Sequence, residues 1–295
     1  MSTKRAEKAQ QTPSTLQIRL GIEDFSLNSI SVELNNDTPH MIVAGGPGSG
    51  RTTVLQTCLL MLASPQYINA KVVLVDFRRS SRLLRRLPYM WMYADNEERL
   101  VATVEALKQE LRARVTQIRE EMKRMEEVDD DDLGSLPMDP IIIAIDDYEQ
   151  IGALLKNPLL DLKEFLLQAR DLGLHIIVAG GPADIMRSDP LLQQVRACRQ
   201  GLILGADPND PQILGVRMSD LPPGRGHLVR RNQRNLIQVA HLASNTMLSW
   251  VTRLIQTYSA SVSRRQPETD SIRSAQPKIV EALPTVNLGA EPLAV

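Results

Sequence analysis

Nine residues between Gly45 and Thr53 have the composition of a phosphate-binding loop. The segment reads Gly45-Gly46-Pro47-Gly48-Ser49-Gly50-Arg51-Thr52-Thr53. Its glycines permit a tight turn in which several backbone N–H groups point at one oxyanion. A helix that begins near Arg51 would add the positive end of its dipole. The segment matches the nucleotide-binding pattern G-x-x-x-x-G-K-[ST], except that arginine replaces the lysine.

The replacement of the usual lysine by Arg51 should affect phosphate binding and phosphoryl transfer differently. A lysine reaches the β- and γ-phosphates as a compact point charge, whereas a guanidinium is planar, permanently charged and able to contact two oxygens. We expect Arg51 to keep affinity for the anion without reproducing the position that supports phosphoryl transfer. Thr52 retains the hydroxyl that coordinates Mg²⁺ in such sites. The alternative is a loop that only resembles a nucleotide site.

A pair of carboxylates follows an apolar segment about a hundred residues later. Residues 140–145 are apolar and rich in isoleucine, which is typical of a buried parallel strand, and Asp146 and Asp147 come directly after them. Asp146 has the place of a carboxylate in the Mg²⁺ shell. Asp147 occupies the position where a glutamate commonly polarises the attacking water. It is one methylene shorter, and a displacement of about 1 Å can lower a rate on the order of a hundredfold. Alone, the pair could also be an acidic turn.

The elements around these residues alternate between strands and helices, which predicts an α/β fold with a parallel-rich sheet and helices on both faces. Residues 229–240 suggest a closing β-hairpin. Because ligands bind at the carboxyl ends of parallel strands, the loop, Asp76, Asp146 and the turn at Gly180-Gly181 should share one edge. Strands are expected near residues 16–20, 30–34, 41–44, 71–75, 141–145, 175–179 and 202–204, and helices near 51–63, 96–127, 160–172, 211–216 and 245–258. Domain boundaries follow: a tail at 1–14, one domain at 15–258, and a tail at 259–295.

Composition narrows the function classes. The chain has 295 residues and a net charge of −1, so the whole molecule has no excess of basic residues of the kind that nucleic-acid binders carry. The polar start lacks a signal sequence, and no apolar run approaches the roughly 18 residues of a membrane span. Cys58 and Cys198 are interpreted as reduced thiols. We expect a cytoplasmic protein that reaches a membrane only through a partner. The four histidines lack zinc-ligand spacing.

Several arginines are candidates for further roles. An arginine from a neighbouring subunit could neutralise charge in a phosphoryl transition state, and Arg199 is the first choice because it precedes a strand expected near the site. Other candidates for this role are Arg170, Arg196 and Arg225. A basic cluster, Arg78, Arg79, Arg82, Arg85 and Arg86, could attract nucleic acid or an acidic partner, although a solvated helix face is the simpler interpretation. The acidic segment at residues 126–132 should be an exposed loop.

Four segments carry a resemblance to a known family. They are Ala144-Ile145-Asp146-Asp147-Tyr148-Glu149, Asn157-Pro158-Leu159-Leu160, residues 168–175 (QARDLGLH) and residues 221–229 (LPPGRGHLV). Together with the phosphate-binding loop they resemble the FtsK/SpoIIIE/HerA superfamily of RecA-like P-loop motor ATPases. In particular, residues 15–258 look like the C-terminal ATPase domain of the EccC family of type VII secretion motors.

The resemblance implies a RecA-like fold, ATP and Mg²⁺ as ligands, and assembly with other ATPase subunits or a membrane-bound motor component. It also implies transport of DNA or polypeptide, with a secreted helical-hairpin protein as a possible substrate and DNA less favoured. It assigns phosphate contact to Arg51, Mg²⁺ to Thr52 and Asp146, and water activation to Asp147.

The chain also departs from the family. The turn Gly180-Gly181-Pro182 lacks the polar sensor of family motors, and the chain has one ATPase domain and no membrane segment. We therefore expect a degenerate ATP-binding module with slow or absent hydrolysis. The alternatives are an active DNA translocase and an adaptor that no longer binds nucleotide.

Overall fold

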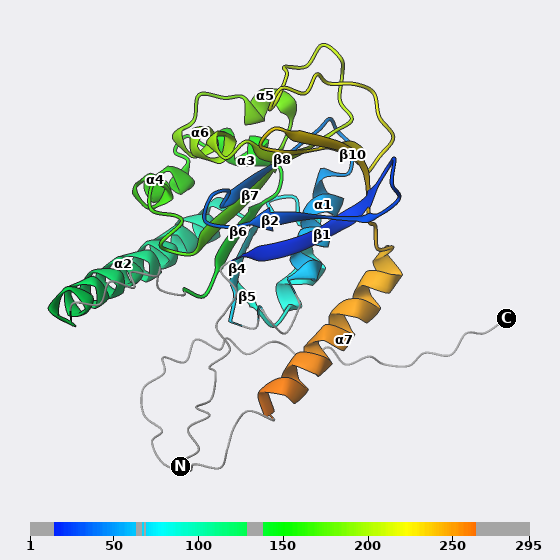
Figure 1. The fold of residues 1–295 in the computed structure, drawn as a ribbon. Helices are drawn as coiled ribbons and strands as arrows, with labels where there is room; N and C mark the ends of the chain where they lie inside the picture. Colours follow the sequence, from blue (N-terminus) through cyan, green and yellow to red (C-terminus); the bar gives the residue numbers. More distant parts are fainter. Residues whose placement is uncertain (1–14, 63–66, 68, 129–137, 264–295) are drawn as a thin grey trace, which may run out of the picture.

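Six adjacent parallel strands, which run to one edge of the sheet, position the candidate site (Figure 1). The computed structural model describes residues 15–62, 67, 69–128 and 138–263. In sheet order the parallel strands are β8 (Gln200–Leu204), β3 (His40–Ala44), β7 (Leu174–Gly180), β6 (Ile141–Ile145), β4 (Lys71–Val75) and β5 (Met90–Ala94). Strands β3, β6, β7 and β8 are buried along their whole length, as expected for a parallel sheet covered on both faces.

Four antiparallel strands extend the sheet beyond β8. They are β9 (Arg225–Arg230), β10 (Gln233–Val239), β1 (Leu16–Glu23) and β2 (Ser29–Leu34). Strands β9 and β10 form the predicted hairpin, in which Arg230 pairs with Gln233. The predicted α/β class with a mostly parallel sheet is therefore confirmed, and the sheet has ten strands within the described residues.

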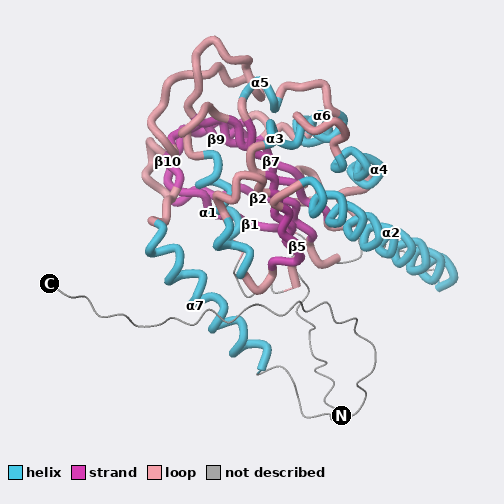
Figure 2. The backbone as a smooth tube through the Cα atoms, turned by 180° about the vertical axis from the view of Figure 1, so that it is seen from behind, coloured by secondary structure: helices cyan, strands magenta, loops and turns pink. Residues whose placement is uncertain are grey.

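Helices cover both faces of the sheet, and each face has its own aliphatic core (Figures 1 and 2). One face packs against α2 (Glu97–Val128), α3 (Tyr148–Gly152), η3 (Pro158–Leu162), α4 (Lys163–Leu166) and α6 (Pro190–Ala197). The other face packs against α1 (Arg51–Met61), η2 (Arg82–Arg86) and α7 (Ser244–Ser263), and β1 and β2 curl over this side. Ile42 and Val43 are neighbours in β3 but belong to opposite cores, because alternate side chains of a strand point to opposite faces.

One predicted helix is shorter than expected, and another is absent from the described structure. The segment expected to be helical at 160–172 is helical only through η3 and α4, after which Leu167 is exposed and turns lead to Gly173 at φ +61°. The helix expected at 211–216 is a tight turn. Ile213 and Val216 form an isolated antiparallel bridge there, while Leu214 and Gly215 have positive φ values.

Other differences concern elements that were not predicted and the ends of the domain. Strand β5 and helix α6 were missed, although α6 has a clear start: Asp189 accepts hydrogen bonds from the N–H groups of Leu191 and Leu192. Helix α7 continues to Ser263, beyond the predicted boundary at 258. Residues 1–14, 129–137 and 264–295, where tails and most of an acidic loop were predicted, lie outside the described residues. No described helix is long and apolar enough to span a membrane.

Candidate nucleotide-binding site

The phosphate-binding loop leaves β3 at the carboxyl edge of the parallel strands and is fastened to both neighbouring strand ends. The Gly45 N–H donates to the Gly180 carbonyl at the end of β7, at 3.4 Å. The Gly46 N–H donates to the Gly205 carbonyl just after β8, at 2.9 Å. These bonds hold the start of the loop in the plane of the sheet, so the remaining residues must turn back toward α1.

Two glycines make that turn possible. Gly48 has φ +74° and Gly50 has φ +103°, a region that residues with a side chain rarely adopt. A Cβ on Gly50 would also lie 3.1 Å from the Gly224 nitrogen, whose N–H donates to the Ser49 carbonyl at 2.8 Å. The segment Pro222-Pro223-Gly224, which resembled a family motif in the sequence, therefore packs directly against the loop.

The turn leaves a group of backbone donors at the start of α1. The N–H groups of Gly48 and of residues 50–53 have no hydrogen-bond acceptor within the described residues. The first turn of α1 contains no acidic residue, and the buried Ser49 hydroxyl also lacks a partner in the described part of the chain. Unpaired N–H groups at a helix N-terminus bind anions such as phosphate. The geometry thus fits the predicted anion site.

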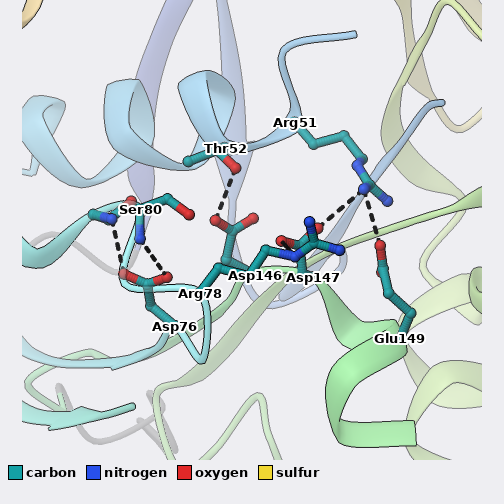
Figure 3. Close-up of polar contacts among 9 residues, drawn as sticks. Arg51, Thr52, Asp76, Arg78, Ser80, Asp146, Asp147 and Glu149 are labelled. Atoms are coloured by element: carbon teal, nitrogen blue, oxygen red, sulfur yellow. Dashed lines mark hydrogen bonds and ion pairs between the residues drawn. The ribbon is translucent and has the colours of Figure 1, made fainter. Parts of the chain in front are cut away.

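Thr52 and Asp146 meet beside this group of donors (Figure 3). The Thr52 hydroxyl donates to Asp146 Oδ2 at 2.8 Å, although 94 residues separate the two in the chain. Asp146 is 2% exposed, and its Oδ1 has no hydrogen-bond partner among the described residues. A hydroxyl beside a carboxylate with a free oxygen is a hard oxygen donor set, which suits Mg²⁺. The residues present therefore fit the metal ion that the family implies.

Burial controls the protonation of Asp146. It raises the pKa of this carboxyl to about 6. The hydrogen bond from Thr52 works against this rise, and the negative charges of Asp147 and Asp76 add to it. Asp76 itself is fully buried and accepts hydrogen bonds from the N–H groups of Ser80 and Ser81 and from the Tyr93 hydroxyl. Asp76 thus lies at the predicted edge, but both of its oxygens are occupied by the protein.

Asp147 is held by two guanidinium groups (Figure 3). Arg51 Nη2 lies 3.0 Å from Asp147 Oδ1, and Arg78 Nε lies 2.6 Å from Asp147 Oδ2. Arg51 Nη2 also lies 2.9 Å from Glu149 Oε1. Arg51 at the lysine position of the loop is therefore shared between two carboxylates of the segment that follows β6.

The coupled carboxylates Asp147 and Glu149 have opposite pKa shifts. Burial and the nearby charge of Glu149 raise the pKa of Asp147, against the attraction of Arg51 and Arg78. Burial also acts to raise the pKa of Glu149, but its own N–H group, Arg51 and the Gly181 N–H together lower it. The surroundings therefore favour the ionised form of Glu149 more than that of Asp147.

The predicted arginine candidates are scattered. Arg199 lies at the amino end of β8, which runs parallel to β3, so it is at the edge opposite the phosphate-binding loop. The expected place of Arg199 near the site of its own chain is therefore wrong, because a residue that precedes a parallel strand cannot lie at its carboxyl end. Its role toward the site of a neighbouring subunit stays a prediction. Arg170 is exposed in the turn before β7 at that same opposite edge, and Arg196 donates to the carbonyls of Ile185 and Arg187. Arg225 follows Gly224 beside the loop and pairs with Asp24.

A family model described as the FtsK/SpoIIIE family matches residues 2–213 of this chain. The chain belongs to the FtsK/SpoIIIE family. Similar curated proteins include the ESX secretion system protein EccC of Thermomonospora curvata, 29% identical over 251 residues and 80% of this chain. ESX-4 secretion system protein EccC4 of Mycobacterium tuberculosis is 31% identical over 236 residues and 76% of this chain. The chain spans only 18% of the length of either relative.

Solved structures identify the same type of domain. The cytoplasmic domain of the Thermomonospora curvata type VII secretion ATPase EccC has a TM-score of 0.65 and 25% identity, with 81% of this chain and 28% of that chain covered. ATPases 2 and 3 of EssC from Geobacillus thermodenitrificans share the fold at a TM-score of 0.67 and 17% identity, covering 89% of this chain and 52% of that one. The predicted relationship to P-loop ATPase domains of the type VII secretion family is confirmed.

Two residues of the site were not predicted, Arg78 and Glu149. Arg78 was grouped with four neighbouring arginines as one cluster, and Glu149 was noted only as part of a family segment. The signal for Glu149 was its place two residues after Asp147. No pattern in the sequence distinguishes Arg78 from Arg79, which pairs with Asp95 instead.

Proposed function

We propose that this chain is an ATP-binding module of a type VII-like protein secretion motor and that it hydrolyses ATP slowly or not at all. The observation that carries the proposal is the 2.8 Å contact between Thr52 and Asp146 beside the unpaired N–H groups of the loop. A phosphate cradle and a hard-cation donor set thus lie next to each other, as a magnesium–nucleotide complex requires.

The predicted binding residues have different roles in this proposal. The N–H groups of residues 48–53 would bind the phosphates, apart from that of Ser49, which already donates to the Gly46 carbonyl. Gly45, Gly46 and Pro47 shape the turn, and Thr53 contributes its N–H group. Thr52 and Asp146 would hold Mg²⁺, which neutralises phosphate charge when bound. Arg51 would supply the positive side chain that contacts the phosphates.

Slow turnover is inferred from the state of Asp147. Both of its oxygens are paired with guanidinium groups, at 3.0 Å and 2.6 Å, and these groups compete with a water molecule for the lone pairs of Asp147. The turn at Gly180-Gly181 also presents no side chain toward the site. Its Gly181 N–H instead helps to lower the pKa of Glu149. Binding without efficient hydrolysis would let ATP act as a ligand that stabilises the domain and its interfaces.

The partners are proposed from the comparisons. The matched relatives are named as ESX secretion system proteins, and one solved structure is of ATPases 2 and 3 of Thermomonospora curvata EccC in complex with a signal sequence peptide. We propose other ATPase domains or a membrane-bound motor component as partners and a helical-hairpin protein as the substrate. The domain would work in the cytoplasm and reach the membrane through such a partner.

A titration with Mg-ATP tests the proposal. Thermal unfolding followed with and without millimolar Mg-ATP should show a higher melting temperature with nucleotide. Thr52→Ala should weaken this shift, while Thr116→Ala, which removes an exposed hydroxyl that donates to the Arg112 carbonyl in α2, should not. An unchanged melting temperature in the wild-type protein would favour the nucleotide-free adaptor.

Phosphate release measured with and without DNA distinguishes an ATP-binding module that hydrolyses ATP slowly from an active DNA translocase. We expect turnover near background under both conditions. Rapid turnover that DNA stimulates would contradict the proposal and favour the DNA translocase.

A further inference from the structure

Arg51 is held by carboxylates on the side of α3, away from the unpaired N–H groups of its own helix. Its Nη2 atom alone contacts both Asp147 and Glu149, at 3.0 Å and 2.9 Å. Its Nη1 atom is buried without a partner among the described residues, and the Arg51 side chain is only 10% exposed. The guanidinium therefore has one fully occupied end and one free end.

Arg51 cannot serve both carboxylates and a phosphate group with the same nitrogen. Its Cα lies at the first residue of α1, so a change of side-chain rotamer moves the guanidinium between the carboxylates and the phosphate cradle. A nucleotide that draws Nη2 into the phosphate cradle must compete with Asp147 and Glu149 for this nitrogen. The strength of that competition then sets part of the nucleotide affinity.

The two carboxylates differ in what happens when Arg51 leaves. Asp147 keeps Arg78, whose Nε lies 2.6 Å from its second oxygen. Glu149 has no other cationic partner among the described residues, and its Oε2 is already buried without a hydrogen bond. Leaving a partly buried carboxylate without its cation is costly. Glu149 is therefore the restraint on Arg51, and Arg78 weakens the hold of Asp147.

We propose that Glu149 and Arg78 are positioning residues that set the affinity for a nucleoside triphosphate by deciding where Arg51 points. This inference rests on the proposed function, because it assumes that the loop binds ATP. Glu149 opposes the movement of Arg51 to the phosphates. Arg78 favours that movement, because it supplies a replacement charge to Asp147.

Opposite effects of two substitutions test this inference. Glu149→Gln should lower the Kd for Mg-ATP, and Arg78→Gln should raise it, each by roughly five- to tenfold. This is near the lower end of the range for one charge-assisted hydrogen bond, because both side chains are partly exposed to solvent. Arg79→Gln is the matched control. Arg79 is the next residue, is 57% exposed against 55% for Arg78, and pairs with Asp95. The Kd of the Arg79→Gln variant for Mg-ATP should stay within about twofold of the wild-type value.

A double-mutant cycle shows whether the effect passes through Arg51. In an Arg51→Gln background, Glu149→Gln should change the Kd by less than about twofold, because no guanidinium remains to be released. A role of Glu149 that was merely structural would give the same change in both backgrounds. Titration with a fluorescent ATP analogue and Mg²⁺, competed by ATP, measures all of these constants.

The outcomes separate this inference from the proposed function. Folded wild-type protein that fails to bind Mg-ATP at millimolar concentration would refute the proposed function. Wild-type binding with an unchanged or weaker affinity in Glu149→Gln would overturn the inference alone. If Glu149→Gln does not fold, Glu149→Asp provides a second test. It shortens the side chain by one methylene, draws the carboxylate away from Arg51, and should also lower the Kd for Mg-ATP. Failure of that variant to do so would also overturn the inference.

Discussion

Asp146 should destabilise the metal-free domain that it serves. It is 2% exposed, lies near two further carboxylates, and receives one hydrogen bond, from Thr52. Burial raises its pKa to about 6 from an ordinary value of 3.8. A difference of roughly two pKa units corresponds to about 3 kcal/mol between the two protonation states. In the absence of a cation, ionising Asp146 at neutral pH therefore costs the folded state up to about this amount.

The sign of the pH dependence follows from proton binding. Between pH 3.8 and about 6 the folded state holds the Asp146 proton and the unfolded chain has released it. The contribution of this group to stability therefore falls as the pH rises through that window and stays low above it. At pH 4 the folded state carries the neutral acid and the penalty is small.

Asp146→Asn should remove this penalty. At pH 7.5 in EDTA we expect the variant to be more stable than the wild-type protein by about 1–3 kcal/mol. The amide oxygen can still accept the Thr52 hydrogen bond, but the amide N–H groups need acceptors of their own, which reduces the gain. A gain of this size raises the melting temperature by roughly 2–4 °C per kcal/mol for a domain of this length. The same variant should lose Mg²⁺-dependent nucleotide binding, which is the usual exchange of function for stability.

Urea unfolding of the two proteins at pH 4, 5, 6 and 7.5 in EDTA measures the effect. The stability difference should be near zero at pH 4 and grow to its full value by pH 7.5. Asp171→Asn, on the exposed turn before β7, controls for the loss of a surface carboxylate. A stability difference that does not vary with pH, or an Asp146→Asn protein less stable than wild type at pH 7.5, would refute the reasoning.

Three further predictions concern the loop and the core. Arg51→Lys should raise the rate of phosphate release while leaving the Kd for Mg-ATP similar; loss of binding would show that the arginine is an adapted feature. Burial lowers the pKa of His40 to about 3 and of His175 to about 4. The contribution of these two histidines to stability should therefore be complete above about pH 6.5 and fall as the pH decreases. Urea unfolding followed against pH should show a smaller loss toward acid pH in His175→Asn than in the wild-type protein. Gly50→Ala places a side chain at φ +103° and 3.1 Å from the Gly224 nitrogen. It should cost about 1–3 kcal/mol in urea unfolding and weaken Mg-ATP binding; wild-type stability would contradict this.

The contact between Thr52 and Asp146 could be predicted from the sequence, because it depends only on strand direction. Thr52 follows β3 and Asp146 follows β6, and both strands run the same way in one sheet with β7 between them. Residues that follow parallel strands gather at one edge whatever lies between them in the chain. Arg199 shows the limit of that argument. It precedes its strand, so the same rule places it at the opposite edge.

The contacts of Arg51 could not be predicted, because they depend on local backbone conformation. Asp147 has φ +49°, which turns the chain sharply at the start of α3. This turn buries Tyr148 against the core and returns Glu149 to the site. Arg79 likewise has φ +60°, so that it and Arg78 diverge to different carboxylates. Strand and helix patterns carry no information about such single-residue conformations.

The charges of the site explain why the metal ion should be required for binding as well as for chemistry. Asp146, Asp147 and Glu149 outnumber Arg51 and Arg78, and the buried Asp76 adds a fourth carboxylate nearby. A free triphosphate would bring further negative charge into this low-dielectric region, where repulsion is strong. A divalent cation held by Thr52 and Asp146 would reverse the sign of that interaction. It also reduces the negative charge that attracts Arg51 toward the carboxylates. The same acidic residues therefore repel free nucleotide and bind magnesium. Because magnesium weakens the attraction of these residues for Arg51, magnesium binding and the release of Arg51 favour each other.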